Sequence, residues 1–198
     1  MGEKQQKMTD TLTHFTHPEH QLLLTHKSST FWCDLCKTSG TGLRYRCETC
    51  DFDLHESCTT YPETLSFYAH PWHKLALADH SASTVGSAIC CDLCREPVKG
   101  FYYKCAPCGF YLHPHCSLSP RIVHSSFHPD HMLMLVPTTG SCSACNKDLM
   151  VWTYRCGICS VNLHYKCLFT AGNEGGSVGD DRADASKKTQ KAVLTARK

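Results

Sequence analysis

The chain has 198 residues and a formal net charge of +2, with 41% hydrophobic and 19% charged residues. Sixteen residues are cysteine and 14 are histidine, far more than an ordinary packed core uses, so we expect a framework of Cys and His side chains to hold the fold. The near-neutral charge disfavours a dedicated nucleic-acid binder, which normally carries a marked basic excess.

We expect no targeting signal at the beginning of the chain. Residues 1–8 are polar and lack the apolar stretch of a secretory signal peptide. The longer apolar runs, such as Met132 to Val136, are far too short to span a bilayer. We therefore expect an intracellular protein of the cytoplasm, the nucleus or both, where thiols stay reduced and Cys clusters bind metal more often than they form disulfides.

A short histidine motif recurs three times along the chain. His17, His70 and His128 each begin a His-Pro-x-His sequence, and an apolar alternation follows every copy. Leu22 with Leu24 is the first of these alternations. Because a period of two is typical of a half-buried strand, we predict a strand after each motif.

A cysteine motif follows each histidine motif. All three copies read Cys-x2-Cys-x10-Cys-x2-Cys-x4-His-x2-Cys, and they begin at Cys33, Cys91 and Cys142. A second alternation, Phe52 with Leu54 in the first copy, predicts a short strand that ends at the His. Self-similarity of this kind indicates three tandem repeats.

Each repeat contains four pairs of Cys or His separated by two residues. Zinc prefers four tetrahedral nitrogen and sulfur ligands, and pairs of this spacing fit one side of such a site. Eight ligands make two closed sites, so three repeats predict about six zinc ions per chain. The spacing leaves open whether the pairs share ions in sequential or interleaved order. A disulfide framework would leave the matched histidines unexplained.

The stretches Thr30–Cys36, Gly42–Cys47 and Cys50–Cys58 together look like a C1 domain. With the His-Pro-x-His lead they resemble more closely the divergent C1 (DC1) modules of plant Cys/His-rich proteins. The resemblance implies a small zinc-stabilised α+β fold of three tandem C1-like modules, each with short antiparallel strands and a short helix around two interleaved zinc sites. The expected boundaries are 14–61, 67–119 and 124–169 for the modules and 170–198 for a disordered tail rich in Gly, Asp and Lys.

C1 folds interleave their sites, so the resemblance assigns three Cys and the late His of each repeat to one ion. The other ion takes two Cys and both His of the lead. The expected ligands are His17, His20, Cys33, Cys36, Cys47, Cys50, His55, Cys58, His70, His73, Cys91, Cys94, Cys105, Cys108, His113, Cys116, His128, His131, Cys142, Cys145, Cys156, Cys159, His164 and Cys167. An ordinary C1 domain ends with a further Cys, but Ser66 stands at that place. His14 is an alternative to His17, and Cys90 is either a spare thiol or a competitor of Cys91.

A closed site with four protein ligands leaves no position open for water or substrate, which indicates structural zinc. We therefore expect a non-enzymatic scaffold that binds protein partners, with no catalytic residues. The resemblance implies a role in intracellular signalling, including stress or hormone responses. Two alternatives remain: a protein-disulfide reductase, which the six Cys-x2-Cys motifs suggest, and a nucleic-acid-binding regulator, which the basic residues near the clusters suggest.

One loop argues against lipid binding. The groove of a typical C1 domain that binds diacylglycerol opens beside the loop between the two Cys-x2-Cys pairs, and that loop includes a Gln-Gly step. Here this loop has ten residues and no Gln in every repeat, as in the stretch from Lys37 to Arg46. We therefore expect no binding to diacylglycerol or to membranes.

Overall fold

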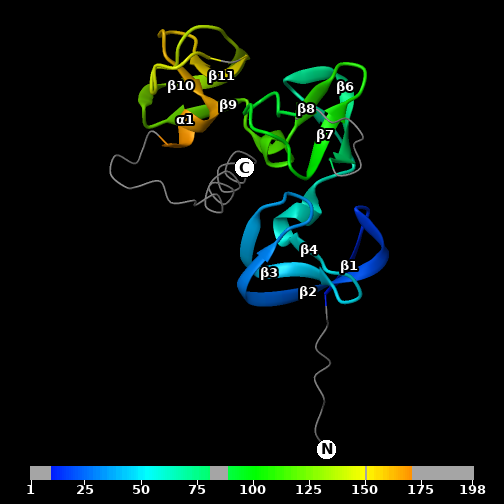
Figure 1. Ribbon diagram of the computed structural model, residues 1–198. Helices are drawn as coiled ribbons and strands as arrows, with labels where there is room; N and C mark the ends of the chain where they lie inside the picture. The colour runs from blue at the N-terminus through cyan, green and yellow to red at the C-terminus, as the bar shows by residue number, and fades with distance from the viewer. Residues whose placement is uncertain (1–9, 81–88, 150, 171–198) are drawn as a thin grey trace, which may run out of the picture. The chain divides into compact units, whose positions relative to one another are not determined.

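The structure is a computed structural model that describes residues 10–80, 89–149 and 151–170. The expected carboxy-terminal tail lies outside these residues. The chain divides into two compact units, residues 1–63 and 64–198, and each repeat forms one four-stranded antiparallel sheet (Figure 1). No helix in the described part of the chain is long and apolar enough to cross a membrane.

The first unit contains the first repeat. Its strands lie in the order β1-β2-β3-β4 and span Thr11–His14, His17–Trp32, Ser39–Cys47 and Phe52–His55. The 16-residue strand β2 pairs with both β1 and β3, and the register of its pairing with β3 shifts between Lys27 and Phe31. Leu22 of β2 and Leu54 of β4 are fully buried. The two alternations therefore supply the core of this small sheet.

The second unit contains the other two repeats. The second repeat has strands β5 (Thr64–Phe67), β6 (His70–Asp79), β7 (Phe101–Cys105) and β8 (Phe110–Leu112), and the third has β9 (Ile122–Ser125), β10 (His128–Pro137), β11 (Trp152–Cys156) and β12 (Asn162–His164). The strands predicted after the histidine motifs are confirmed as β2, β6 and β10. Those predicted before the late His are confirmed as β4, β8 and β12.

Helix is scarcer than the α+β expectation implied. Within the described residues, the first two repeats have only 3₁₀ helices, at Glu56–Thr60 and His115–Leu118, and the third has the six-residue helix α1 at Tyr165–Thr170. One helical turn is enough to carry the last Cys back to the His three residues before it. In the second repeat Ser119, which follows the helix, is extended and precedes Pro120, and a proline disfavours helical geometry in the residue before it. The modules are therefore mostly strand.

The second and third repeats share one hydrophobic core. Fully buried Leu75 of the second repeat and Leu133 of the third belong to the same cluster of buried side chains. The linker crosses this cluster, because the hydroxyls of Tyr154 and Tyr68 both donate to the carbonyl oxygen of Pro120, at 2.7 and 3.4 Å. The two repeats are thus one packed body, which the repeat pattern in the sequence did not indicate.

Candidate metal centres

The first Cys pair of each repeat lies on a tight turn. Directly after it, Lys37, Arg95 and Asn146 have positive φ angles of 51°, 62° and 56°. Their amides donate to the carbonyl of the first Cys of the pair at 2.9, 2.9 and 2.8 Å. This left-handed residue closes the turn in all three copies, so the two cysteines share one site.

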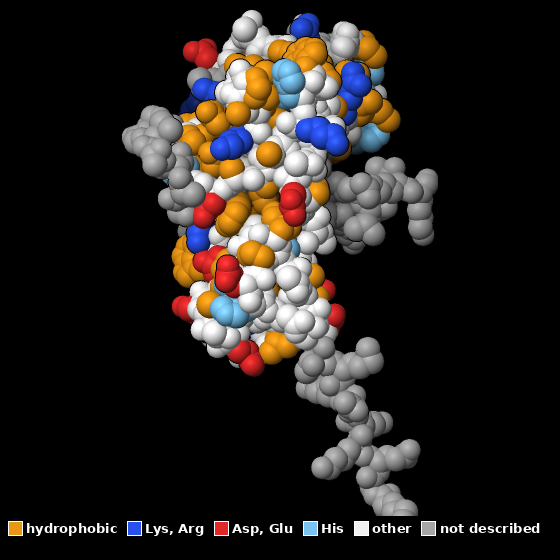
Figure 2. All heavy atoms as spheres, turned by 90° about the vertical axis from the view of Figure 1, so that its right-hand side faces the viewer, with side chains coloured by type: hydrophobic (Ala, Val, Ile, Leu, Met, Phe, Trp, Pro, Cys, Tyr) orange, Lys and Arg blue, Asp and Glu red, His pale blue; other side chains and the backbone are white. Residues whose placement is uncertain are grey.

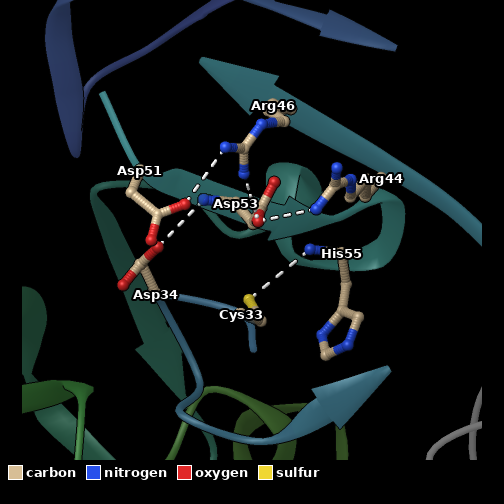
Figure 3. Close-up of polar contacts among 7 residues, drawn as sticks. All are labelled: Cys33, Asp34, Arg44, Arg46, Asp51, Asp53 and His55. Atoms are coloured by element: carbon tan, nitrogen blue, oxygen red, sulfur yellow. Dashed lines mark hydrogen bonds and ion pairs between the residues drawn. The ribbon is translucent and has the colours of Figure 1, made fainter. Parts of the chain in front are cut away.

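A strand brings the late His to this turn. The amide of Asp34 donates to the carbonyl of Asp53 at 2.8 Å, and the amide of Asp53 donates back to the Asp34 carboxylate at 2.9 Å (Figure 3). The His55 amide then contacts Cys33 Sγ at 3.4 Å. The other repeats make the same pair of bonds, Asp92 with Tyr111 and Ser143 with Asn162.

Three Cys and one His meet at this point in each repeat. The ligand atoms of Cys33, Cys36, His55 and Cys58 all lie within 4.8 Å of one another, and so do those of Cys91, Cys94, His113 and Cys116. In the third repeat, His164 Nδ1 lies 3.4 Å from Cys145 Sγ and 3.8 Å from Cys167 Sγ. In every copy the ring presents Nδ1 to the thiols.

Two Cys and two His form a second group in each repeat. The groups are His17, His20, Cys47 and Cys50, then His70, His73, Cys105 and Cys108, then His128, His131, Cys156 and Cys159. Nδ1 of the second His lies 3.3, 3.2 and 3.5 Å from the last Cys of its group. The structure therefore brings the pairs together in the interleaved order.

The two alternatives left open by the sequence lie outside these groups. His14 is buried, and its Nδ1 lies 2.6 Å from the hydroxyl of Thr16, so His17 joins the group instead. Cys90 is half-buried and pairs with Pro97 through an isolated bridge, and it is not in the group that contains Cys91.

Neighbouring groups orient the histidine rings, and sequence reasoning missed them. Nε2 of His113 faces the carbonyl oxygen of Pro97 at 3.2 Å, and Nε2 of His164 faces that of Asp148 at 2.8 Å. A carbonyl acceptor on Nε2 leaves Nδ1 unprotonated toward the cysteines, which is how metal-binding histidines are usually fixed. Phe52 stacks on the ring of His17 at 4.4 Å, so this residue positions a ring as well as filling the core.

The distances within the groups fit a zinc ion. Zinc binds sulfur at about 2.3 Å and nitrogen at about 2.0–2.1 Å, so a tetrahedral ion separates its ligand atoms by roughly 3.3–3.8 Å. The contacts between ring nitrogens and sulfurs run from 3.2 Å at Cys108 to 3.9 Å at Cys116. Four ligands at this spacing would complete the tetrahedron of a zinc ion.

The thiols of a three-Cys group cannot all ionise without a cation. Hydrogen bonds from Cys33 and Cys58 lower the pKa of Cys36 to about 3, and contacts with Cys33 and Cys36 raise the pKa of Cys58 far above its ordinary value. In the second repeat the contact with Cys116 lowers the pKa of Cys91, whereas burial raises that of Cys116. A divalent cation that stabilises thiolates resolves this conflict, so the donor sets fit zinc.

Comparison with known proteins agrees with this geometry. The family model described as C1 domain matches residues 15–59, 68–117 and 126–168, so the three matches follow the three repeats. No solved structure matches the chain.

Several curated proteins are similar over parts of the chain. The autophagy receptor Nbr1 of Schizosaccharomyces pombe is 33% identical over 115 residues, which are 48% of this chain and 28% of that protein. Probable nucleoredoxin 1 of Arabidopsis thaliana is 43% identical over 51 residues, 26% of this chain and 9% of that protein. Diacylglycerol kinase theta of Mus musculus is 22% identical over 169 residues, 76% of this chain and 18% of that protein. The chain thus spans less than a third of the length of each of these relatives.

Proposed function

Because this chain belongs to the C1 domain family, whose model matches it three times, we propose that it is a non-enzymatic zinc scaffold that binds protein partners inside the cell. The closed groups of two or three Cys with one or two His support this proposal most directly. Each group offers four ligands at tetrahedral spacing, which leaves zinc no position for a substrate. The zinc ions then act by holding the three modules in shape.

The likeness to relatives supports a role in protein interaction. One similar protein is an autophagy receptor, which acts by binding other molecules. We propose stress or hormone signalling in the cytoplasm or nucleus as the setting. Proximity labelling with the intact chain tests this: partners should be labelled by the wild type and lost when chelation removes the zinc. Labelling that is identical with and without zinc would contradict a zinc-held scaffold.

Diacylglycerol binding is the point at which the proposal departs from one relative. The likeness to diacylglycerol kinase theta is 22% identity. The loop that borders the lipid groove in typical C1 domains is ten residues long in every repeat here, and Lys37, Thr38 and Ser39 give its first copy a polar start. We expect the zinc-loaded chain to stay out of the floating fraction with liposomes of phosphatidylcholine and phosphatidylserine, with or without diacylglycerol. A diacylglycerol-dependent shift into that fraction would contradict this part.

Disulfide reduction is the enzymatic alternative, and one relative carries the name nucleoredoxin. A redox-active Cys pair needs a free thiolate, usually at the start of a helix. Here the thiols of each Cys-x2-Cys pair face a histidine ring or a further Cys of a four-ligand group. The zinc-loaded chain should therefore not accelerate the reduction of insulin by dithiothreitol, and acceleration above the uncatalysed rate would favour the reductase.

A further inference from the structure

A polar groove of about 410 Å³ lies on the first repeat, lined by residues on either side of the ligand Cys33 but by none of the ligands themselves. It runs between the end of β2, at Phe31 and Trp32, and the charged side chains of β3 and β4. Figure 3 shows these charged side chains pointing toward one another. The lining residues are Lys27, Thr30, Phe31, Trp32, Asp34, Arg44, Arg46, Asp51 and Asp53.

The groove contains buried charged atoms that have no partner. Asp53 is only 6% exposed, and its Oδ2 accepts from Arg44 at 2.8 Å and from Arg46 at 2.9 Å. Its other carboxylate oxygen, Oδ1, is buried and has no hydrogen-bond partner. The Nε atom of Arg44, which is 9% exposed, is also unpartnered. Native proteins rarely leave such atoms unpaired. The structure therefore indicates a missing hydrogen-bond donor opposite Oδ1 of Asp53.

Aromatic side chains border the same groove. Trp32 is 66% exposed, although it lies next to the buried Phe31. The guanidinium of Arg44 already lies over the Phe31 ring, 5.5 Å from its centroid. Aromatic faces attract guanidinium and ammonium groups, and Trp is the strongest of them. The wall of the groove thus already holds one cation and exposes a second aromatic ring.

The charge around the groove favours a cation. Residues 10–63 carry eight acidic and four basic side chains, and Figure 2 shows acidic side chains on the surface of this first unit. Lys37, Arg44 and Arg46 are already ion-paired with carboxylates. Even with Lys27 counted, acidic side chains of residues 10–63 outnumber basic ones. The side chain of Asp51 at the rim is 94% exposed, and its Oδ1 accepts from Arg46 at 3.1 Å.

The second repeat lacks the buried charged residues of this groove. The positions that match Arg44 and Asp53 are Tyr102 and Tyr111 in the second repeat, and these two rings pack edge to face at 5.8 Å. The position of Trp32 is occupied by Cys90 there. The second repeat therefore fills with aromatic packing what the first leaves as a charged groove.

We propose that this groove binds an arginine or lysine side chain of a basic peptide segment in a partner protein. The cation lies against Trp32, and the carboxylates of Asp51 and Asp53 receive its N–H groups. This inference rests on the proposed scaffold function and names the chemistry of one partner.

The test uses the full zinc-loaded chain and fluorescence anisotropy with a fluorescein-labelled Arg-Gly repeat peptide, in about 0.15 M salt so that distant charges are screened. Trp32→Ala should weaken binding about fivefold or more, and Trp32→Phe should restore part of it. Asp51→Asn should weaken it about threefold. Both side chains are exposed, so the variants should retain their zinc content.

Glu56→Gln is the matched control, because it removes one exposed carboxylate that does not line the groove. It should change the affinity by less than about 1.5-fold. Equal weakening by Glu56→Gln and the groove variants would overturn the inference, and so would tighter binding of a Glu-Gly repeat peptide. If the wild type binds neither peptide while zinc-dependent partner labelling persists, the groove proposal fails and the scaffold proposal stands.

Discussion

The shared core of the second and third repeats predicts that one buried hydroxyl stabilises both. Tyr154 is fully buried, and its hydroxyl donates to the carbonyl of Pro120 at 2.7 Å. Tyr68 contacts the same carbonyl at a longer 3.4 Å, so it cannot replace this bond in full. Tyr154→Phe removes a short buried hydrogen bond and should lower the free energy of unfolding of the second unit by about 1–2 kcal/mol.

The assay is thermal unfolding of the zinc-saturated chain combined with amide hydrogen exchange. For a unit of this size, a loss of 1–2 kcal/mol lowers Tm by roughly 4–10 °C. Because the bond joins the repeats, protection should fall in β7 of the second repeat as well as in β11 of the third. Tyr45→Phe is the matched control: Tyr45 is the corresponding tyrosine of the first repeat, and its hydroxyl makes only an exposed contact of 3.5 Å with Asp10.

The control should change stability by less than about 0.5 kcal/mol. If Tyr154→Phe lowers protection in the third repeat alone, or no more than Tyr45→Phe does in the first, the reasoning about a shared body is wrong.

Three further predictions concern the strain at Val151, the ring of His55 and the division of the chain into two units. Val151 is 52% exposed and has a φ of +66°, at the position where the first repeat has Gly42. Val151→Gly should therefore raise the free energy of unfolding of the second unit by about 1 kcal/mol. Thermal unfolding measures this, and a lower Tm of the variant would contradict backbone strain at Val151. A Cβ on Gly40 would lie 2.2 Å from Nε2 of His55, so Gly40→Ala should displace that ring and weaken zinc retention against a chelator. Gly157→Ala, whose Cβ meets nothing within 4 Å, should retain zinc as the wild type does, and equal losses in the two variants would refute this account. Cys58→Ser should unfold the first repeat alone, whereas Cys116→Ser should lower amide protection in the second and third repeats together. If hydrogen exchange shows that Cys116→Ser affects only the second repeat, the shared core is contradicted.

The sequence predicted the features that depend on local spacing. The two residues of a His or Cys pair separated by two residues lie on one turn, so both can reach the same metal site. Alternating Leu residues such as Leu22 and Leu24 lie on one face of a segment only when it is a strand. These rules indicated the strands and the His and Cys pairs that supply the ligands. The interleaved order came from the resemblance to C1 domains, because spacing cannot say which distant pairs come together.

Other features depend on contacts that spacing does not encode. Tyr154 of the third repeat donates to the carbonyl of Pro120 in the linker. The spacing of the repeats does not indicate this contact. The choice of His17 over His14 is of the same kind, because Thr16 binds the ring of His14.

The number of bound zinc ions tests the central claim most directly. Six four-ligand groups predict that native mass spectrometry of the chain, purified without chelator, finds about six zinc ions per molecule. Each repeat contributes two of these ions, one at its Cys2His2 group and one at its Cys3His group. A maximum of about three ions would mean that the His-Pro-x-His residues do not bind metal, and the account of two closed centres in each repeat would be wrong.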